Sequence, residues 1–204
     1  PIYVTAEDIK AAHDMGFVIK LLAIAERLPD DEGIVVRVHP AMVPRSHPLA
    51  SVRLAFNAVF VEAEAAGEVM FYGRGAGGAP TASSVLGDVV TVARNIVAGH
   101  RGSVYKAYAE LPVRGLDAAH TRYSISLRVA DEPGVLATIA NAFADEGVSI
   151  QVVRQDGSGE DAHLLVRTHR STEASLSRTI KRLRSLTAVR EVVGVMRVEG
   201  EAGN

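Results

Sequence analysis

The stretch DEPGVLATIANAFADEG, residues 131–147, carries the strongest fold signal in the chain. Apolar residues recur along it at helical spacing, at Leu136, Ile139, Ala140 and Phe143. Pro133 suits the first turn of a helix, and Asp131 or Glu132 places negative charge where a helix N-terminus favours it. Gly147 is typical of a helix end. The stretch therefore predicts an amphipathic helix with one face directed at a core.

Strand patterns flank this helix on both sides. RYSISLRVA (122–130) alternates strictly, which predicts a half-buried strand. Its expected inner residues are Tyr123, Ile125, Leu127 and Val129, and its expected solvent-facing residues are Arg122, Ser124, Ser126 and Arg128. VSIQVVRQ (148–155) and AHLLVRTH (162–169) predict a hairpin around the turn SGED (158–161).

The remaining elements complete a known arrangement. STEASLSRTIKRLRSL (171–186) predicts a helix that begins after Ser171 or Thr172 and turns Leu176, Ile180 and Leu183 inward. VREVVGVMRV (189–198) predicts a last strand. The order βαββαβ is that of the ferredoxin-like fold. Because this fold serves unrelated functions, the site has to decide among them.

Two functions of this fold are disfavoured by residue types. RNA-recognition modules stack bases on strand aromatics, whereas the outward residues here are Ser, Arg, Gln and His. Thiolate metal sites are excluded because the chain has no cysteine. Its seven histidines also show no spacing typical of a metal site. We therefore expect neither nucleic-acid nor metal binding.

The motifs DEPGVL (131–136) and EGVSIQ (146–151) resemble the ACT domain, a regulatory module that binds amino acids, over residues 121–198. Gly134 lets a ligand approach the backbone, and the N–H groups at the helix start suit a carboxylate. The alternative is a tight Pro-Gly turn that only supports the core. The resemblance implies an effector site at Asp131, Pro133, Gly134, Val135, Leu136, Ile150 and Gln151.

The first half of the chain is rich in predicted strands. TAEDIKAAHDMG (5–16) predicts a helix whose Thr5 and Asp8 form a capping box. Two strands, 17–28 and 33–43, flank the turn PDDEG. Further along we expect a hairpin over 57–73 that turns at Ala66–Gly67, and a helix over 81–99 with Val85, Val89, Val92 and Ile96 on one face.

The glycine run of FYGRGAGGAPTASSVLGD (71–88) requires separate consideration. Gly73, Gly75 and Gly78 fit the G-x-G-x-x-G spacing of a dinucleotide fingerprint. That motif belongs on the first turn of a parallel sheet, but here it follows an expected antiparallel hairpin. VYKAYAEL (104–111) is a candidate short strand, too far along to supply the matching acidic residue. We therefore expect a simple strand-to-helix turn.

The same run, YGRGAGGAPTASSVLGD (72–88), resembles the C-terminal part of homoserine dehydrogenase, as do GFVIKLLAIA (16–25), VRVHPAMV (36–43) and HPLASVRLAFNAV (47–59). Many members of this family continue into an ACT domain. The resemblance implies an oxidoreductase that uses NADP or NAD, with Gly77 near the nicotinamide. It places the nucleotide-binding domain and the catalytic residues N-terminal to Pro1, so that no catalytic residue lies in this chain and the fragment alone is inactive.

Taken together, these features predict an α+β protein: a strand-rich catalytic-domain segment, residues 1–115, then a linker and ferredoxin-like βαββαβ ACT domain, residues 116–204, with the boundary near 115–121. The net charge of −2 suggests neither nucleic acid nor membrane. We expect a cytoplasmic homo-oligomer, a dimer or larger, with L-threonine or another small amino acid as effector. The alternative is a stand-alone, non-catalytic amino-acid-binding or assembly module.

Overall fold

The computed structural model describes residues 4–100, 109–157 and 162–200. The described chain forms two compact units. The first combines the residues up to Arg45 with those from Leu111 onward, and the second runs from Ser46 to Glu110. The predicted turn at 158–161, and most of the candidate strand at 104–111, lie outside the described residues. The division into domains near residue 115 stays a prediction.

The C-terminal part of the first unit has the predicted βαββαβ order, which we call the βαββαβ half (residues 120–198). Its elements are β5 (His120–Val129), α3 (Val135–Ala144), β6 (Ile150–Asp156), β7 (His163–Thr168), α4 (Glu173–Ser185) and β9 (Val189–Val198), with a short β8 (Ser171–Thr172) beside β5. The strands pair in the order β9-β5-β7-β6, each antiparallel to its neighbour. The mixed α+β prediction and the ferredoxin-like order are confirmed.

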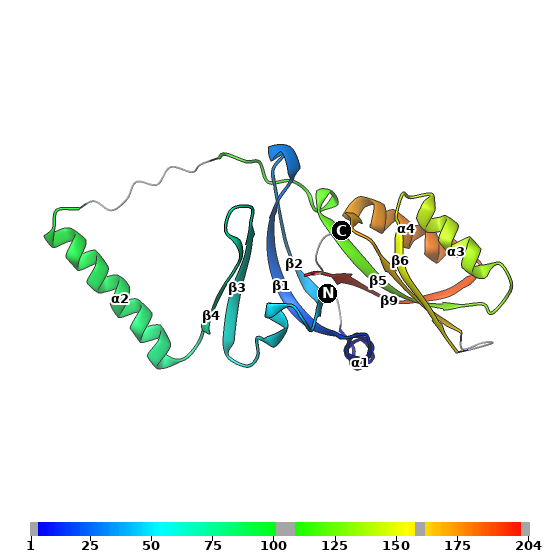
Figure 1. Cartoon of the computed structure of the whole chain (residues 1–204), viewed down its shortest axis with the longest axis horizontal. Helices are drawn as coiled ribbons and strands as arrows, with labels where there is room; N and C mark the ends of the chain where they lie inside the picture. Colours follow the sequence, from blue (N-terminus) through cyan, green and yellow to red (C-terminus); the bar gives the residue numbers. More distant parts are fainter. Residues whose placement is uncertain (1–3, 101–108, 158–161, 201–204) are drawn as a thin grey trace. The chain divides into compact units, whose positions relative to one another are not determined.

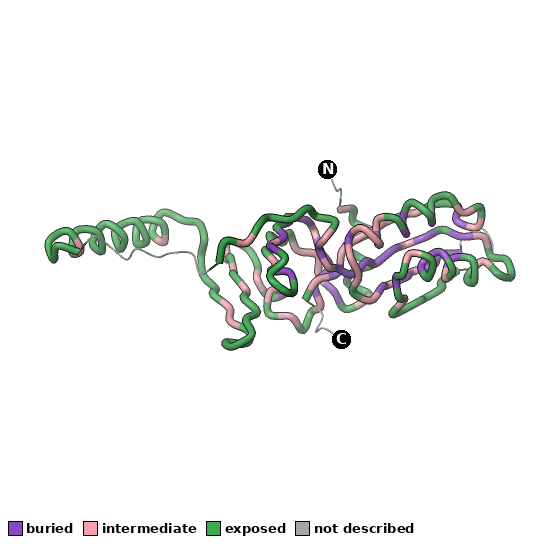
Figure 2. Tube along the Cα trace, turned by 90° about the horizontal axis from the view of Figure 1, so that it is seen from above, coloured by how far each residue is buried: buried purple, intermediate pink, exposed green. Residues whose placement is uncertain are grey.

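Helices α3 and α4 lie together over one face of this sheet (Figure 1) and enclose its core with it. The buried residues follow the central strands (Figure 2). Fully buried side chains come from the sheet and from both helices: Ile125 and Leu127 of β5, Ile139 and Phe143 of α3, and Leu176 and Leu183 of α4. The predicted inward faces of β5 and α4 are therefore confirmed.

An N-terminal hairpin extends this sheet, which the sequence pattern does not indicate. Helix α1 (Ala6–Asp14) begins at Thr5, whose capping box with Asp8 is formed as predicted. Strands β1 (Phe17–Arg27) and β2 (Ile34–Pro44) pair antiparallel, joined by the turn η1 (Pro29–Asp31). The end of β2 then pairs parallel to the end of β9. The six strands follow the order β1-β2-β9-β5-β7-β6.

The hairpin corrects the prediction for the outer face of β5. Arg122 and Ser124 were expected to face solvent, but both are buried. They pair with Val198 and Met196 of β9, and this face packs against the first segment of the chain. The shared apolar cluster contains Ala12, Met15, Phe17, Ile19, Met42, Met196 and Val198. Period-two alternation identifies two faces of a strand, but it does not show that a distant segment covers the polar one.

Helix α3 begins two residues later than the sequence predicts. Pro133 precedes the helix, and Gly134 is its N-cap with a left-handed backbone (φ 91°). The register of the buried face shifts accordingly: Leu136 is 48% exposed, while Ala142 takes an inner position. A glycine adopts this conformation at little cost, so the chain can turn sharply between β5 and α3.

The second unit contains a two-stranded antiparallel hairpin and one long helix. Strands β3 (Phe56–Ala63) and β4 (Gly67–Arg74) pair as predicted, but the turn lies at residues 64–66, slightly before the expected Ala66–Gly67, because Gly67 already belongs to β4. Helix α2 (Gly78–Val97) begins three residues before the expected start. It has no buried residue, and its predicted apolar face is exposed (Figure 2). Among the described residues, no helix is long and apolar enough to cross a membrane.

Candidate functional site

A small cavity of about 120 Å³ opens where β5 leads into α3. The end of β5 contributes Val129, and the following turn contributes Ala130, Asp131 and Glu132. Leu164 of β7, which is buried, forms part of the lining. The remaining lining residues are Gly134, Val135, Leu136 and Gln155. The cavity thus combines apolar side chains, two carboxylates, an amide and the start of a helix.

Gly134 sets the shape of this cavity. Its left-handed backbone makes the sharp turn into α3, and the Val135 N–H points back to the Glu132 carbonyl at 3.3 Å. No atom lies within 4 Å of the position that a Cβ on Gly134 would occupy. The first N–H groups of a helix lack intrahelical acceptors and attract anions. A ligand carboxylate can therefore approach the backbone closely here.

The structure gathers some of the predicted effector residues and separates others. Asp131, Gly134, Val135 and Leu136 all line the cavity. Pro133 does not line it, although it lies in the same turn. Ile150 and Gln151 also lie outside the lining, because Ile150 packs against the core and a register shift occurs at Gln151. Gln151 instead accepts a hydrogen bond from Arg167 Nε at 3.1 Å.

Gln155 is a lining residue that the sequence analysis did not select. It pairs with Leu164 across the β6–β7 hairpin, and Leu164 pairs in turn with Leu127 of β5. A strand register counted outward from the predicted turn at 158–161 would have placed Gln155 opposite Leu164. Residue type alone gave no such signal, because polar residues are common near hairpin ends.

The glycine run forms the strand-to-helix turn expected for it. Gly77 is the N-cap of α2, with a φ of 131° that side-chain-bearing residues rarely adopt. A Cβ on Gly75 would overlap the side chain of Asn57, whose Nδ2 lies 1.5 Å from that position. Because β3 and β4 are antiparallel, this turn has none of the parallel strand context of a Rossmann fingerprint.

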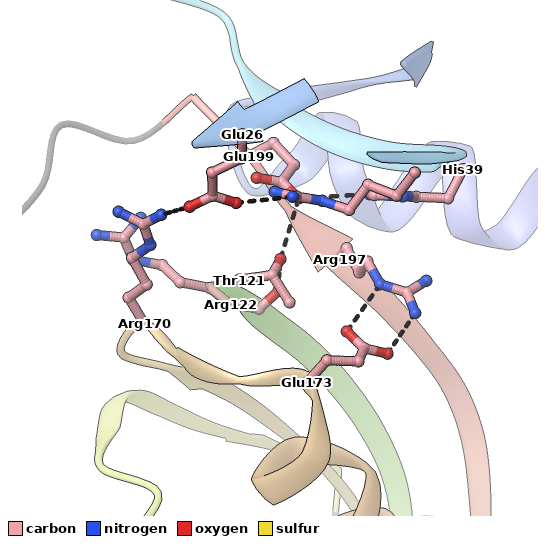
Figure 3. Close-up of polar contacts among 9 residues, drawn as sticks. Glu26, His39, Thr121, Arg122, Arg170, Glu173, Arg197 and Glu199 are labelled. Atoms are coloured by element: carbon pink, nitrogen blue, oxygen red, sulfur yellow. Dashed lines mark hydrogen bonds and ion pairs between the residues drawn. The ribbon is translucent and has the colours of Figure 1, made fainter. Parts of the chain in front are cut away.

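A partly buried polar cluster joins the N-terminal hairpin to the βαββαβ half (Figure 3). We call it the ionic joint, and its members are Glu26, Arg37, His39, Thr121, Arg170 and Glu199. Sequence analysis selected none of them, because the three hairpin residues and their three partners are far apart along the chain. Within the described part of the chain, no three His, Asp or Glu side chains are grouped to hold a metal ion.

Glu199 is the central acceptor of the ionic joint. Its Oε1 lies 3.3 Å from His39 Nε2 and 3.4 Å from Arg37 Nη2, and it accepts a 3.1 Å hydrogen bond from Thr121. Burial raises the pKa of Glu199, but His39, Arg37 and Thr121 together lower it more, so that its pKa is below the ordinary value. The carboxylate is therefore charged at neutral pH.

Comparison with known proteins assigns both parts of the chain. Residues 123–188 match the ACT domain, the class of regulatory module that this fold and its loop cavity define. Residues 2–90 match homoserine dehydrogenase. The chain therefore matches the C-terminal part of homoserine dehydrogenases, including an ACT domain. Dehydrogenases are oxidoreductases, so its relatives belong to that class.

The relatives cover nearly the whole chain. It is 50% identical to the homoserine dehydrogenase of Corynebacterium glutamicum over 199 residues, 96% of this chain and 45% of that protein. It is 52% identical to the enzyme of Mycobacterium tuberculosis H37Rv, covering 97% and 47%. A crystal structure of the Thiobacillus denitrificans enzyme matches with a TM-score of 0.86 at 36% identity, covering 97% and 46%. The chain spans about half the length of the curated relatives it matches and corresponds to their C-terminal part.

Proposed function

We propose that this chain is the C-terminal portion of an NAD(P)-dependent homoserine dehydrogenase whose ACT domain binds L-threonine as a feedback effector. The parent enzyme interconverts L-aspartate 4-semialdehyde and L-homoserine, a step toward threonine and methionine. The observation that carries the proposal is the combination of a homoserine dehydrogenase segment with an ACT domain. The first strand-to-helix turn of that domain forms a cavity at Gly134.

The cavity offers a complementary partner for each part of an amino acid. The N–H groups at the start of α3 suit the carboxylate. Asp131 and Glu132 suit the ammonium group, and Gln155 can both donate to and accept from a side-chain hydroxyl. Val135 and Leu136 suit a methyl group. L-threonine, which carries all four features, is the effector that this set of partners favours.

The cofactor proposal rests on Gly77. This residue has no side chain, is exposed, and stands at the N-terminus of α2, so its backbone leaves room for a flat ring. NADP or NAD supplies or accepts the hydride when bound. In this proposal Gly77 supports the nicotinamide end, while the nucleotide-binding domain and the residues that act on the substrate belong to the N-terminal half of the parent enzyme.

Calorimetric titration of the 204-residue chain tests the effector proposal. We expect saturable binding of L-threonine, with L-isoleucine, L-methionine and NADPH as comparison ligands. Gly134→Ala should abolish it, because a methyl group would enter the space left for the carboxylate. Gly147→Ala is the matched control: Gly147 also has a left-handed backbone and open space around it, but it lies at the other end of α3. Loss of binding in both variants would indicate backbone strain instead of site contact.

The catalytic part of the proposal has its own test. The 204-residue chain should show no oxidation of NADPH with L-aspartate 4-semialdehyde, and measurable turnover would contradict this. The coding sequence upstream of Pro1 should encode a nucleotide-binding glycine motif followed by a lysine-bearing linker. If no amino acid binds and no such sequence precedes the chain, a non-catalytic assembly module becomes the better description.

We also propose that the protein is a cytoplasmic homo-oligomer, a dimer or larger. One face of the N-terminal hairpin exposes Leu21, Val36 and Val38 at 73%, 57% and 70%. Exposed apolar residues gathered on a sheet face mark interaction sites. Light scattering coupled to gel filtration should give at least twice the chain mass of 21.6 kDa. A monomer at micromolar concentration would contradict the proposal.

A further inference from the structure

The ionic joint lies between two parts of the fold that share few backbone contacts. β2 pairs with β9 over only two residue pairs, Ala41 with Arg197 and Met42 with Val198. One further backbone hydrogen bond, from Glu199 N to Met42 O, follows this pairing. A cation–π contact adds to this: Arg167 Cζ lies over the Phe17 ring, 5.4 Å from its centroid. Side chains therefore carry most of the attachment of the hairpin: apolar ones in two shared clusters, and polar ones in the ionic joint.

Two carboxylates organise the joint from opposite sides. Glu26 of the hairpin accepts a 2.7 Å hydrogen bond from Arg37 and also pairs with Arg170, just before β8. Glu199, the residue directly after β9, faces Arg37 and His39 of β2. The side chains of Arg37 and His39 are about as buried as the core, 5% and 4% exposed. Arg37 thus bridges one carboxylate from each side.

Contacts of this type define geometry more than they stabilise it. A buried ion pair gains little net free energy, because desolvation offsets the attraction between the charges. Loss of one partner is nevertheless costly, since the other charge is left buried and unpaired. The hairpin therefore has a well-defined attached position, and a small displacement of either side disrupts several contacts together.

The central strands lead from the effector cavity to this joint. Val129, at the end of β5, lines the cavity, and Thr121, near its start, donates to Glu199. β9 runs in the opposite direction, with Val189 paired to Val129 and Glu199 directly after its last residue. At about 3.3 Å per residue, each ten-residue strand spans roughly 30 Å. The effector cavity and the ionic joint therefore lie at opposite ends of the same pair of strands, β5 and β9.

We propose that the ionic joint transmits effector occupancy of the ACT cavity to the β1–β2 hairpin, with Glu199 as the residue that couples the two. This inference rests on the proposed effector function. A ligand at the β5–α3 turn shifts the ends of β5 and β9, and the joint converts that shift into a change in how firmly the hairpin is attached. The hairpin belongs to the homoserine dehydrogenase segment of the chain, so the ligand acts on that segment.

Hydrogen exchange and calorimetry on the 204-residue chain test this coupling. In the unaltered chain, L-threonine should change amide exchange in peptides covering residues 17–44. In Glu199→Gln this response should be lost. By linkage, the affinity for L-threonine should also change, by at least about 5-fold. Glu191→Gln is the matched control, because Glu191 lies on β9, the strand that Glu199 directly follows, but pairs with Arg128 at the surface and is 50% exposed.

The outcomes separate the two proposals. If no amino acid binds, the effector function and the coupling both fail. If L-threonine binds but exchange over residues 17–44 does not change, or if Glu199→Gln responds like Glu191→Gln, only the coupling is overturned. Should Glu199→Gln fold poorly, Thr121→Ala provides the milder variant. It removes one hydrogen bond to Glu199 and should weaken the response in the same direction.

Discussion

The hydroxyl of Tyr123, on β5, donates a 2.6 Å hydrogen bond to Glu173 Oε1 at the start of α4. Both residues are buried, at 5% and 7% exposure. Arg197 of β9 pairs with the same carboxylate and lies over the Tyr123 ring, 5.7 Å from its centroid. Tyr123 thus donates a hydrogen bond to the buried carboxylate of Glu173, the first residue of α4. This contact holds the start of α4 against the sheet.

Replacement of Tyr123 by phenylalanine should destabilise the protein at neutral pH. A hydrogen bond to a charged group contributes about 1.5–3 kcal/mol, so urea unfolding at pH 7 should show a loss near the lower value. Burial, followed by the hydrogen bond to Glu173, raises the pKa of Tyr123 well above its ordinary value.

The raised pKa predicts the pH dependence of this loss. Above about pH 10 the unfolded chain releases the tyrosine proton and the folded chain retains it, so the stabilisation disappears as pH rises. The difference in unfolding free energy between the unaltered chain and Tyr123→Phe should therefore be smaller at pH 11 than at pH 7. An equal difference at both values would show that Tyr123 ionises as easily in the folded protein.

Glu199 should respond to acid in the opposite sense. Because its pKa is lowered in the folded protein, its contribution is complete above the ordinary glutamate pKa and is lost as pH falls below it. Glu199→Gln should cost about 2 kcal/mol at pH 7, and less at pH 3.5. Guanidinium unfolding at both pH values measures this loss of unfolding free energy. For the control, Glu191→Gln, the loss should be near zero at both pH values. A cost independent of pH would contradict a charge-based role.

Two leucines, one in each helix of the βαββαβ half, provide a direct test of the buried face. Leu176 is fully buried in α4, whereas Leu136 is 48% exposed in α3. Leu176→Ala should lower the unfolding free energy by about 2–5 kcal/mol, and Leu136→Ala by less than about 0.5 kcal/mol. Because Leu136 lines the cavity, the latter variant should instead weaken L-threonine binding. Equal destabilisation by both would place Leu136 in the core after all.

The glycine loop permits a double-mutant cycle. Gly75→Ala requires the Asn57 side chain to leave its position, at a cost of about 1 kcal/mol, because the two would overlap. In an Asn57→Ala background the same change should cost little. Thermal unfolding of the four proteins gives the interaction energy between the sites. Additive effects would mean that Asn57 does not restrict residue 75.

Local patterns in the sequence determine much of this protein. The capping box at Thr5, the alternation through Tyr123 to Val129, and the inward face of α4 are formed as predicted. Each depends on contacts within a few residues, or on one strand or helix facing one core, so each leaves a periodic signal. The family resemblance rests on short motifs of the same kind, and the comparisons confirm it.

Burial and pairing between segments that are far apart along the chain were decided only by the tertiary structure. Pairing of β2 with β9 buries Arg122 and Ser124, although their alternation marks them as solvent-facing. Arg37 and Glu199 meet across 162 positions, and Gln155 reaches the cavity only through strand register. A residue's own type and neighbours do not specify what covers it, because burial and pairing depend on the packing of the entire unit.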